Sequence, residues 1–149
     1  MFNIRKALVT DLNKLLILIT NINETERKYL RYDKESDTLL PRLLKNIKED
    51  HVILFVNDDL VFGFLEYTIQ ANSKIWIYSF YVDKTYRRKT YNLLLATFVA
   101  MKKCYKLPIR FTVQKGNRTM EALVRFIKAE FVKDYGDGRC EYLVKVVET

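Results

Sequence analysis

The stretch Lys74–Val82 constrains the fold more than any other part of the chain, because both of its faces are largely apolar. Alternate residues form the two faces: Ile75, Ile77, Ser79 and Tyr81 on one, and Trp76, Tyr78, Phe80 and Val82 on the other. A strand that is apolar on both sides is typical of the centre of a sheet with helices on each face. We therefore predict an α/β domain built around this strand.

Hydrophobic periodicity predicts the remaining elements. Strands are expected at 2–8, 51–56, 60–70, 107–114, 131–135 and 139–147, and helices at about 10–22, 37–48, 91–106 and 117–130. The turn residues Asn57-Asp58-Asp59 and Gly136-Asp137-Gly138 predict two antiparallel hairpins. The helix at 91–106 is apolar almost all round, which predicts deep packing. The order βααβββαβαββ, with a crossover helix between Val82 and Pro108, predicts a mixed sheet with helices on both faces.

Length and composition favour a single domain spanning 1–149. The chain has 149 residues, 49% of them apolar, with 4 Gly, 2 Pro and no internal repeat. The apolar run Leu15–Ile19 is too short to span a bilayer, so no membrane association is expected. Cys104 and Cys140 lack a C-x-x-C spacing, and a reducing cytoplasm fits best. The only histidine, His51, is assigned no functional role, and no metal cluster is found.

Positive charge is concentrated in one part of the chain. The segment 83–116 holds nine basic residues and one acidic residue, a local excess that equals the net charge of +8. Such a concentration attracts nucleotide-like cofactors, nucleic acid or anionic surfaces. A solvated basic surface is the alternative, and for Lys102, Lys103 and Lys106 it is the preferred one.

The most informative segment is 81–95, where the central strand leads through a basic loop into a helix. A helix N-terminus offers unpaired N–H groups and the positive end of a dipole, so anions bind there readily. Arg87, Arg88 and Lys89 would strengthen that attraction. The segment therefore predicts a site for a phosphate-bearing ligand.

At this point the chain resembles the GNAT family of acyl-CoA-dependent N-acetyltransferases, in element order and in the frame of this loop. The family's R/Q-x-x-G-x-G/A appears as Arg87-x-x-Thr90-x-Asn92, five residues after Val82. The resemblance implies a GNAT-like acyl-CoA N-acyltransferase fold and acetyl-CoA as the cofactor. It assigns the cofactor to one set of residues: Tyr81, Val82, Arg87, Arg88, Lys89, Thr90, Tyr91 and Asn92.

Both family glycines are replaced, by Thr90 and Asn92. Glycine lets a backbone approach a pyrophosphate and adopt a positive φ. A left-handed Thr90 would cost about 1–2 kcal/mol, whereas Asn tolerates that region. Since three cations lie nearby, we expect cofactor binding to be weakened but retained.

The second family landmark, A-x-x-x-Y-x-x-x-G-F, appears as Ala122-x-x-x-Phe126-x-x-x-Glu130-Phe131. The family tyrosine commonly protonates the leaving thiolate, and Phe126 has no proton to give. Another hydroxyl or water must then protonate the thiolate, or transfer is slow or lost; Tyr135 and Tyr91 are the candidate hydroxyls. Glu66 is the candidate base, with a solvated strand glutamate as the alternative. The resemblance also implies that a backbone N–H near 80–82 polarises the thioester carbonyl.

The sequence is compatible with two functions. The first is transfer of an acetyl group from acetyl-CoA to a primary amine of a small molecule or protein. The second is a catalytically inactive GNAT-fold protein that binds nucleic acid or a protein through its basic surface, as the replacements at Thr90, Asn92, Phe126 and Glu130 suggest. The family reads its acceptor through the region Ile22–Lys48. The protein is expected to be a monomer or a homodimer.

Overall fold

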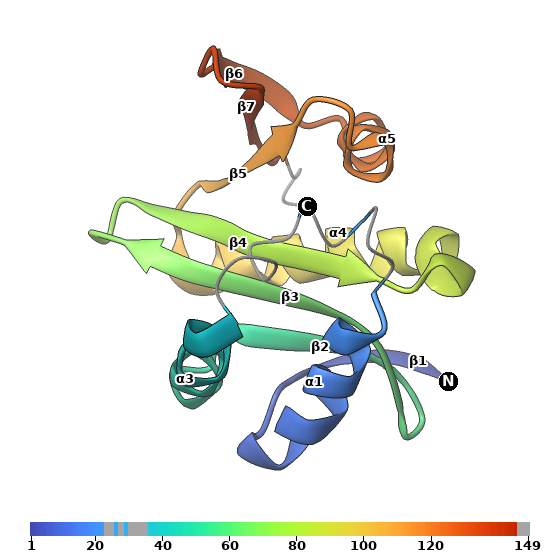
Figure 1. The fold of residues 1–149 in the computed structure, drawn as a ribbon. Coiled ribbons are helices and arrows are strands. Elements are labelled where there is room, and N and C mark those ends of the chain that lie inside the picture. Colours follow the sequence, from blue (N-terminus) through green and yellow to red (C-terminus); the bar gives the residue numbers. More distant parts are fainter. Residues whose placement is uncertain (23–25, 27–28, 30–35, 146–149) are drawn as a thin grey trace. The chain divides into compact units, whose positions relative to one another are not determined.

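The computed structural model describes residues 1–22, 26, 29 and 36–145. Its strands are β1 (Phe2–Lys6), β2 (Val52–Asn57), β3 (Leu60–Gln70), β4 (Lys74–Val82), β5 (Ile109–Gln114), β6 (Glu130–Asp134) and β7 (Arg139–Leu143). The helices are α1 (Leu12–Thr20), α3 (Ser36–Lys48), α4 (Arg87–Tyr105) and α5 (Arg118–Ile127), with 3₁₀ turns η1 (Val9–Asp11) and η2 (Lys84–Tyr86). Figure 1 shows these elements along the chain.

The predicted element order and the mixed sheet are confirmed. Seven strands form the order β1-β2-β3-β4-β5-β7-β6. β4 pairs with β5 in parallel, while the β1–β2, β2–β3, β5–β7 and β6–β7 pairs are antiparallel. The two largest boundary differences are four residues each: β7 ends at Leu143 where a strand at 139–147 was expected, and α4 begins at Arg87 and not at Tyr91. The basic residues expected in a loop therefore form the first turn of a helix.

The described chain divides into two compact units. The N-terminal unit comprises residues 1–68 and 78–87, and the C-terminal unit comprises 69–77 and 88–149. Each unit thus contains part of β3 and part of β4. The single domain at 1–149 stays a prediction.

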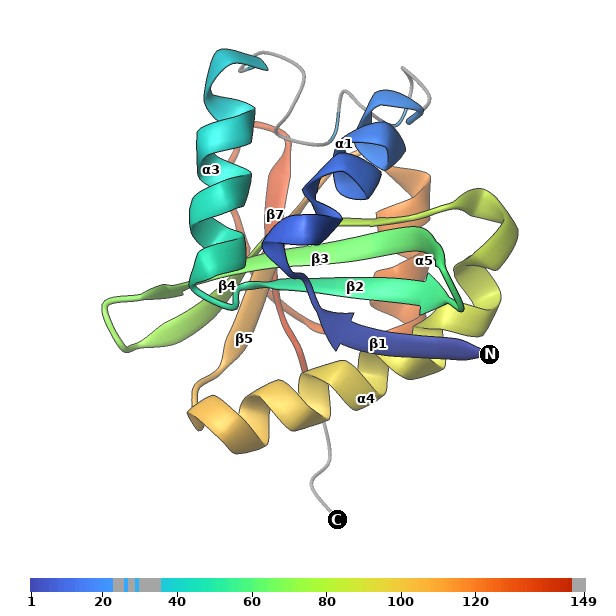
Figure 2. The same ribbon diagram turned by 90° about the horizontal axis from the view of Figure 1, so that it is seen from below.

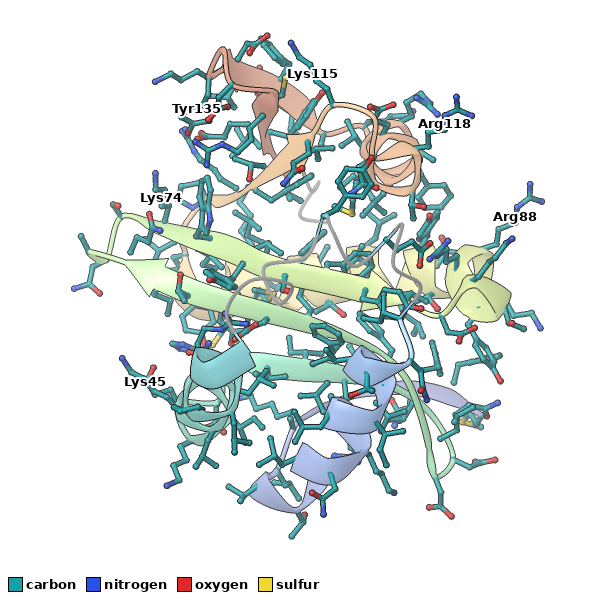
Figure 3. All side chains as sticks on the ribbon, in the orientation of Figure 1. Lys45, Lys74, Arg88, Lys115, Arg118 and Tyr135 are labelled. Atoms are coloured by element: carbon teal, nitrogen blue, oxygen red, sulfur yellow. The ribbon has the colours of Figure 1, made fainter. Side chains whose placement is uncertain are left out.

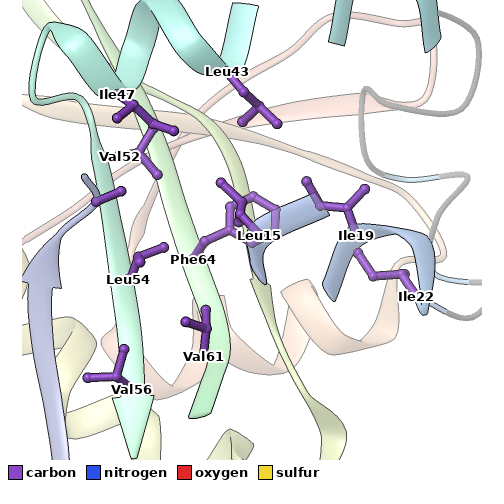
Figure 4. Packing of buried hydrophobic residues seen from close by; sticks show 11 residues of the cluster. Leu15, Ile19, Ile22, Leu43, Ile47, Val52, Leu54, Val56, Val61 and Phe64 are labelled. Atoms are coloured by element: carbon purple, nitrogen blue, oxygen red, sulfur yellow. The ribbon is translucent and has the colours of Figure 1, made fainter. Parts of the chain in front are cut away.

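In the N-terminal unit, α1 and α3 pack on one face of the strands (Figures 2 and 4). Leu15, Ile19 and Ile22 follow helical spacing on one side of α1, and Leu43 and Ile47 do the same on α3. They meet a row of strand residues, namely Val52, Leu54, Val56, Val61 and Phe64. A register shift between Phe55 and Val56 marks a bulge against β3, which explains how Val61 and Phe64 reach the same face.

Phe55 of β2 belongs to an aromatic cluster on the other face of the strands, because successive strand side chains point to opposite faces. Phe55 lies 6.5 Å from Phe62 and 6.1 Å from Phe80, measured between ring centroids. Tyr86 of η2 stacks on Phe62 at 4.5 Å and meets Phe2 edge-on at 5.7 Å. The cluster thereby anchors η2, the turn that follows β4.

The C-terminal unit joins β5, β6 and β7 to helices α4 and α5. The buried residues of α4 are Thr90, Leu94, Thr97, Phe98 and Met101, a single stripe at helical spacing. Ala96, Ala100 and Lys103 are exposed. The expectation of a helix packed almost all round is therefore wrong, since the small residues of α4 face solvent.

Within the part of the chain that the structure describes, no helix is long and apolar enough to cross a membrane. The same residues contain no group of acidic, histidine and cysteine side chains suited to a metal ion. Both cysteines are free thiols, with Cys104 exposed and Cys140 buried.

Candidate functional site

The turn after β4 is fixed by hydrogen bonds centred on Asp83. The Asp83 N–H donates to the Phe62 carbonyl at 2.8 Å, which ties the turn to β3. One Asp83 carboxylate oxygen accepts from the Thr85 N–H at 3.0 Å, and the Asp83 carbonyl accepts from the Tyr86 N–H at 2.9 Å. The N–H groups of Thr85 and Tyr86 are thus satisfied within the turn, as in an Asx-capped helix start.

Arg87 closes the same turn with its side chain. Its Nε donates to the Val82 carbonyl at 3.0 Å, and its terminal nitrogen pairs with the Glu26 carboxylate. The guanidinium carbon also lies 6.0 Å from the centre of the Tyr81 ring. Burial raises the pKa of Tyr81, with a further contribution from the charges of Glu26 and Asp83. The Tyr81 hydroxyl is therefore a poor acid at neutral pH.

Residues 88–92 lie in the first turns of α4 and differ sharply in exposure. Arg88, Lys89 and Asn92 are exposed, Tyr91 is half-buried and Thr90 is fully buried. Figure 3 shows the Arg88 side chain extending outward from α4. Thr90 and Asn92 do not belong to the described non-glycine residues with positive φ, so the left-handed strain considered for Thr90 does not arise. The helix start instead presents two cations at its positive end.

Glu66 forms a buried polar network with α3. Its side chain is fully buried, which rules out a solvated surface glutamate. One carboxylate oxygen accepts from the Asn46 amide at 2.5 Å and from Arg42 Nε at 3.4 Å. Arg42 also donates to the Tyr78 hydroxyl at 3.3 Å, with its guanidinium carbon 4.6 Å from the centre of that ring. The network therefore joins β3, α3 and β4 inside the N-terminal unit.

Tyr135 lies in the C-terminal unit, just after β6 (Figure 3). Its hydroxyl donates to the buried Glu141 carboxylate, whose other oxygen accepts from Arg110 at 2.9 Å. The hydrogen bond to Glu141 raises the pKa of Tyr135, and partial burial and the charge of Glu141 act in the same direction. Lys133 and Arg139 lie 4.8 and 5.1 Å from the ring centre. Tyr135 thus holds its proton more firmly than an ordinary tyrosine.

Solved structures of acetyltransferases match this chain over almost its whole length. A GNAT-family acetyltransferase from Staphylococcus aureus Mu50 matches with a TM-score of 0.78 at 17% identity, covering 97% of this chain and 100% of that one. The chain has the GNAT fold. No protein-family model matches the sequence, and no curated protein matches it either.

Two further GNAT-fold neighbours have informative descriptions. A PaiA N-acetyltransferase from Thermoplasma acidophilum, solved in complex with coenzyme A, matches with a TM-score of 0.77 at 21% identity over 97% of this chain and 99% of that one. The ribosomal-protein-S18-alanine N-acetyltransferase of Escherichia coli matches with a TM-score of 0.69 at 10% identity over 99% and 97%. At sequence identities this low, the matches establish the fold of this chain and not its activity or substrate.

The second GNAT landmark falls in the C-terminal unit. Phe126 on α5 is 46% exposed, and its ring lies 5.1 Å from that of Tyr91 on α4. Tyr91 is therefore the tyrosine whose ring the structure places beside the Phe126 position. Glu130, in place of the landmark glycine, begins β6 and pairs with Lys145 at 3.3 Å. Its φ is not positive, so the backbone here does not need glycine.

The candidate residues fall into the two units. Glu66, Tyr81, Val82 and Arg87 belong to the N-terminal unit, and residues 88–92 and Tyr135 belong to the C-terminal unit. Much of the expected acceptor region lies outside the described residues, namely 23–25, 27–28 and 30–35. Sequence reasoning missed Glu26, Asp83 and Asn46. For Asp83 a signal was present, since Asp is a common cap directly before a helical turn, here η2. Glu26 and Asn46 act across the fold and carry no local signal.

Proposed function

We propose that this protein is an N-acetyltransferase that transfers the acetyl group of acetyl-CoA to a primary amine. The observation that carries the proposal is the GNAT fold over almost the whole chain, shared with a neighbour solved in complex with coenzyme A. The Glu66 network adds a buried carboxylate of the kind that enzyme sites use. The acceptor is a small-molecule or protein amine.

The residues at the start of α4 fit a phosphate-bearing ligand. Arg88 and Lys89 are exposed cations at the positive end of a 19-residue helix. Thr90 is buried in helical geometry, so its side chain does not force the backbone into a strained conformation. In this proposal, residues 81–92 surround the diphosphate of coenzyme A, with the roles named from sequence: Tyr81, Val82, Arg87, Arg88, Lys89, Thr90, Tyr91 and Asn92.

Acetyl-CoA supplies an acetyl group activated as a thioester. Attack by the amine forms a C–N bond, the C–S bond breaks, and the electron pair leaves on sulfur as a thiolate. The amine nitrogen must lose a proton and the thiolate must gain one. The protein's task is therefore to accept one proton, donate another and polarise the carbonyl.

Glu66 is the proposed base and Tyr135 the proposed acid. Because Glu66 is fully buried, this role requires a proton relay, such as one water, between the amine and the carboxylate. The raised pKa of Tyr135 makes it a weak donor, which predicts slow protonation of the thiolate. We accordingly expect a slow enzyme, since the stronger general acids accelerate such steps by about 10²–10⁴-fold.

The proposal is tested by measuring acetyl-CoA binding by titration calorimetry, and thiol release in an activity assay, for the wild type and Glu66→Gln. Wild-type protein should bind acetyl-CoA and release free thiol when supplied with a panel of primary amines. Glu66→Gln should keep the binding and lower kcat by about 10²-fold or more if Glu66 is the base. Asn46→Ala is the matched control, because it removes a hydrogen bond to Glu66 and keeps the carboxylate. Absence of binding heat and of a thermal shift at millimolar acetyl-CoA would reject the proposal.

Phe126 favours a second candidate, a catalytically inactive GNAT-fold protein. Its ring is half-exposed and has no hydroxyl proton to donate, although it occupies the position of the landmark tyrosine. Such a protein would bind nucleic acid or a protein through exposed cations such as Lys84, Arg88 and Lys103. Affinity for RNA or DNA that falls steeply with salt, together with no thiol release, would favour this candidate. We place either protein in the cytoplasm, as a monomer or homodimer.

A further inference from the structure

Arg87 is already engaged on two edges of its guanidinium. Nε donates to the Val82 carbonyl at 3.0 Å, and the terminal nitrogen pairs with Glu26. The side chains of Arg87 and Glu26 are only 16% and 29% exposed. Both partners lie in the N-terminal unit, so the ion pair joins the end of β4 to Glu26 within that unit.

These contacts engage two of the five guanidinium N–H groups of Arg87. A phosphate that contacted the other N–H groups would lie beside the Glu26 carboxylate. The negative charge of Glu26 would repel this phosphate and cancel much of the attraction of Arg87. The geometry thus opposes the role that the loop frame alone suggests for Arg87.

We propose that Arg87 is a positioning residue, which acts on the ligand only by holding Glu26 and cancelling its charge. The proposal rests on the proposed binding of coenzyme A. The guanidinium of Arg87 donates to both the Glu26 carboxylate and the Val82 carbonyl. Asp83 accepts hydrogen bonds from the backbone N–H groups of Thr85 and Tyr86. The turn therefore reaches its shape before any ligand arrives. Arg88, the next residue along, is exposed and is the matched cation for comparison.

Coenzyme A binding to four variants tests the proposal: Arg87→Gln, Glu26→Gln, the double variant and Arg88→Gln. Calorimetry at several NaCl concentrations gives Kd and its salt dependence. Arg87→Gln should weaken binding by about two- to fivefold, because an uncancelled Glu26 repels phosphate, and Glu26→Gln should tighten it by a similar factor. The double variant should return to within about twofold of wild type, since Gln–Gln is again a neutral hydrogen-bonded pair. Arg88→Gln should weaken binding and flatten its salt dependence.

A direct phosphate contact by Arg87 gives a different result. The double variant would then bind as weakly as Arg87→Gln, with a flattened salt dependence in both. That outcome would overturn the proposal, because removal of Glu26 could not compensate for a lost ligand.

Amide hydrogen exchange gives a second readout that needs no ligand. Exchange at Thr85 and Tyr86 should be faster in Arg87→Gln, recover in the double variant and stay unchanged in Arg88→Gln. If the wild type binds no coenzyme A, the proposed function fails and the exchange rates alone decide the role of Arg87. Unchanged exchange in Arg87→Gln, or no recovery in the double variant, contradicts the proposal.

Discussion

At the scale of single residues, Asp11 links strand β1 to helix α1 through one buried carboxylate. Its oxygens accept from both terminal nitrogens of Arg5, at 2.7 and 2.8 Å, and from the Leu8 N–H at 2.8 Å. The hydrogen bond from Arg5 holds the pKa of Asp11 below its usual value, against the opposing effect of burial. The ionised form is thus the one that the fold stabilises.

This contact predicts a specific pH dependence of stability. Because the pKa of Asp11 is lowered on folding, its contribution is fully present above the unfolded pKa of about 3.9 and is lost as the pH falls through the folded pKa. Asp11→Asn should cost about 1–3 kcal/mol at pH 7 and make the acid limb of the curve shallower. Urea unfolding between pH 2 and 7 measures both effects. Asp59→Asn, at an exposed turn position, is the control and should change neither.

The site illustrates how far residue-level reasoning from sequence extends. Glu66 was selected from its place among apolar neighbours in a strand, and that pattern also accounts for its burial. Its donors Asn46 and Arg42 lie on α3, 20 and 24 residues away in sequence. Hydrogen-bond partners at that separation depend on tertiary packing, for which a single sequence carries no periodic signal.

At the scale of elements, the sequence predicted the bounds of β3 and β4 and missed the start of α4 and the end of β7. The bounds of β3 and β4 match the predicted ranges 60–70 and 74–82, because both strands are long and apolar and are bounded by turn residues. The start of α4 was placed four residues late. Apolar periodicity does not predict a helix at these positions, because the side chains of Arg87, Arg88 and Lys89 are all charged. Their helical conformation follows from η2, which is capped by Asp83 and leads directly into α4.

At the scale of elements, the close approach of β3 to the end of β4 requires a glycine at position 63. A Cβ atom there would lie 2.8 Å from the Tyr81 carbonyl oxygen and 3.2 Å from the Val82 Cα. Both are backbone atoms, so β4 itself would have to move. Gly63→Ala should therefore destabilise the protein by about 1–3 kcal/mol and weaken coenzyme A binding, as measured by urea unfolding and calorimetry.

Gly136→Ala separates this steric effect from backbone strain. Gly136 has φ of +78°, and a Cβ there would meet nothing within 4 Å. Its substitution should cost about 1–2 kcal/mol through conformation alone, with coenzyme A affinity unchanged. Equal losses of affinity in the two variants would contradict a specific role for Gly63.

At the scale of the whole molecule, the charge distribution is less one-sided than the sequence implied. Three of the nine cations of segment 83–116 pair with carboxylates from outside it: Arg87 with Glu26, Arg110 with Glu141, and Lys115 with Asp134. Counting charges along the chain could not reveal these pairs, because the carboxylates come from other elements. The attraction for anions therefore rests on exposed side chains such as Arg88 and Lys103.

Cooperative unfolding is the whole-molecule property that decides whether 1–149 behaves as one domain. The boundary between the two compact units passes through β3 after Thr68, through β4 after Ile77 and through α4 after Arg87. Unfolding of either unit alone would leave three broken elements with unpaired backbone groups, which is costly. We therefore expect one transition in urea.

Trp76 is the only tryptophan and lies in the C-terminal unit, so its fluorescence reports on that unit, whereas far-UV circular dichroism reports on both units. The two midpoints and m-values should coincide. A fluorescence transition displaced from the dichroism transition would mean that the units unfold separately, and the single-domain prediction would be wrong.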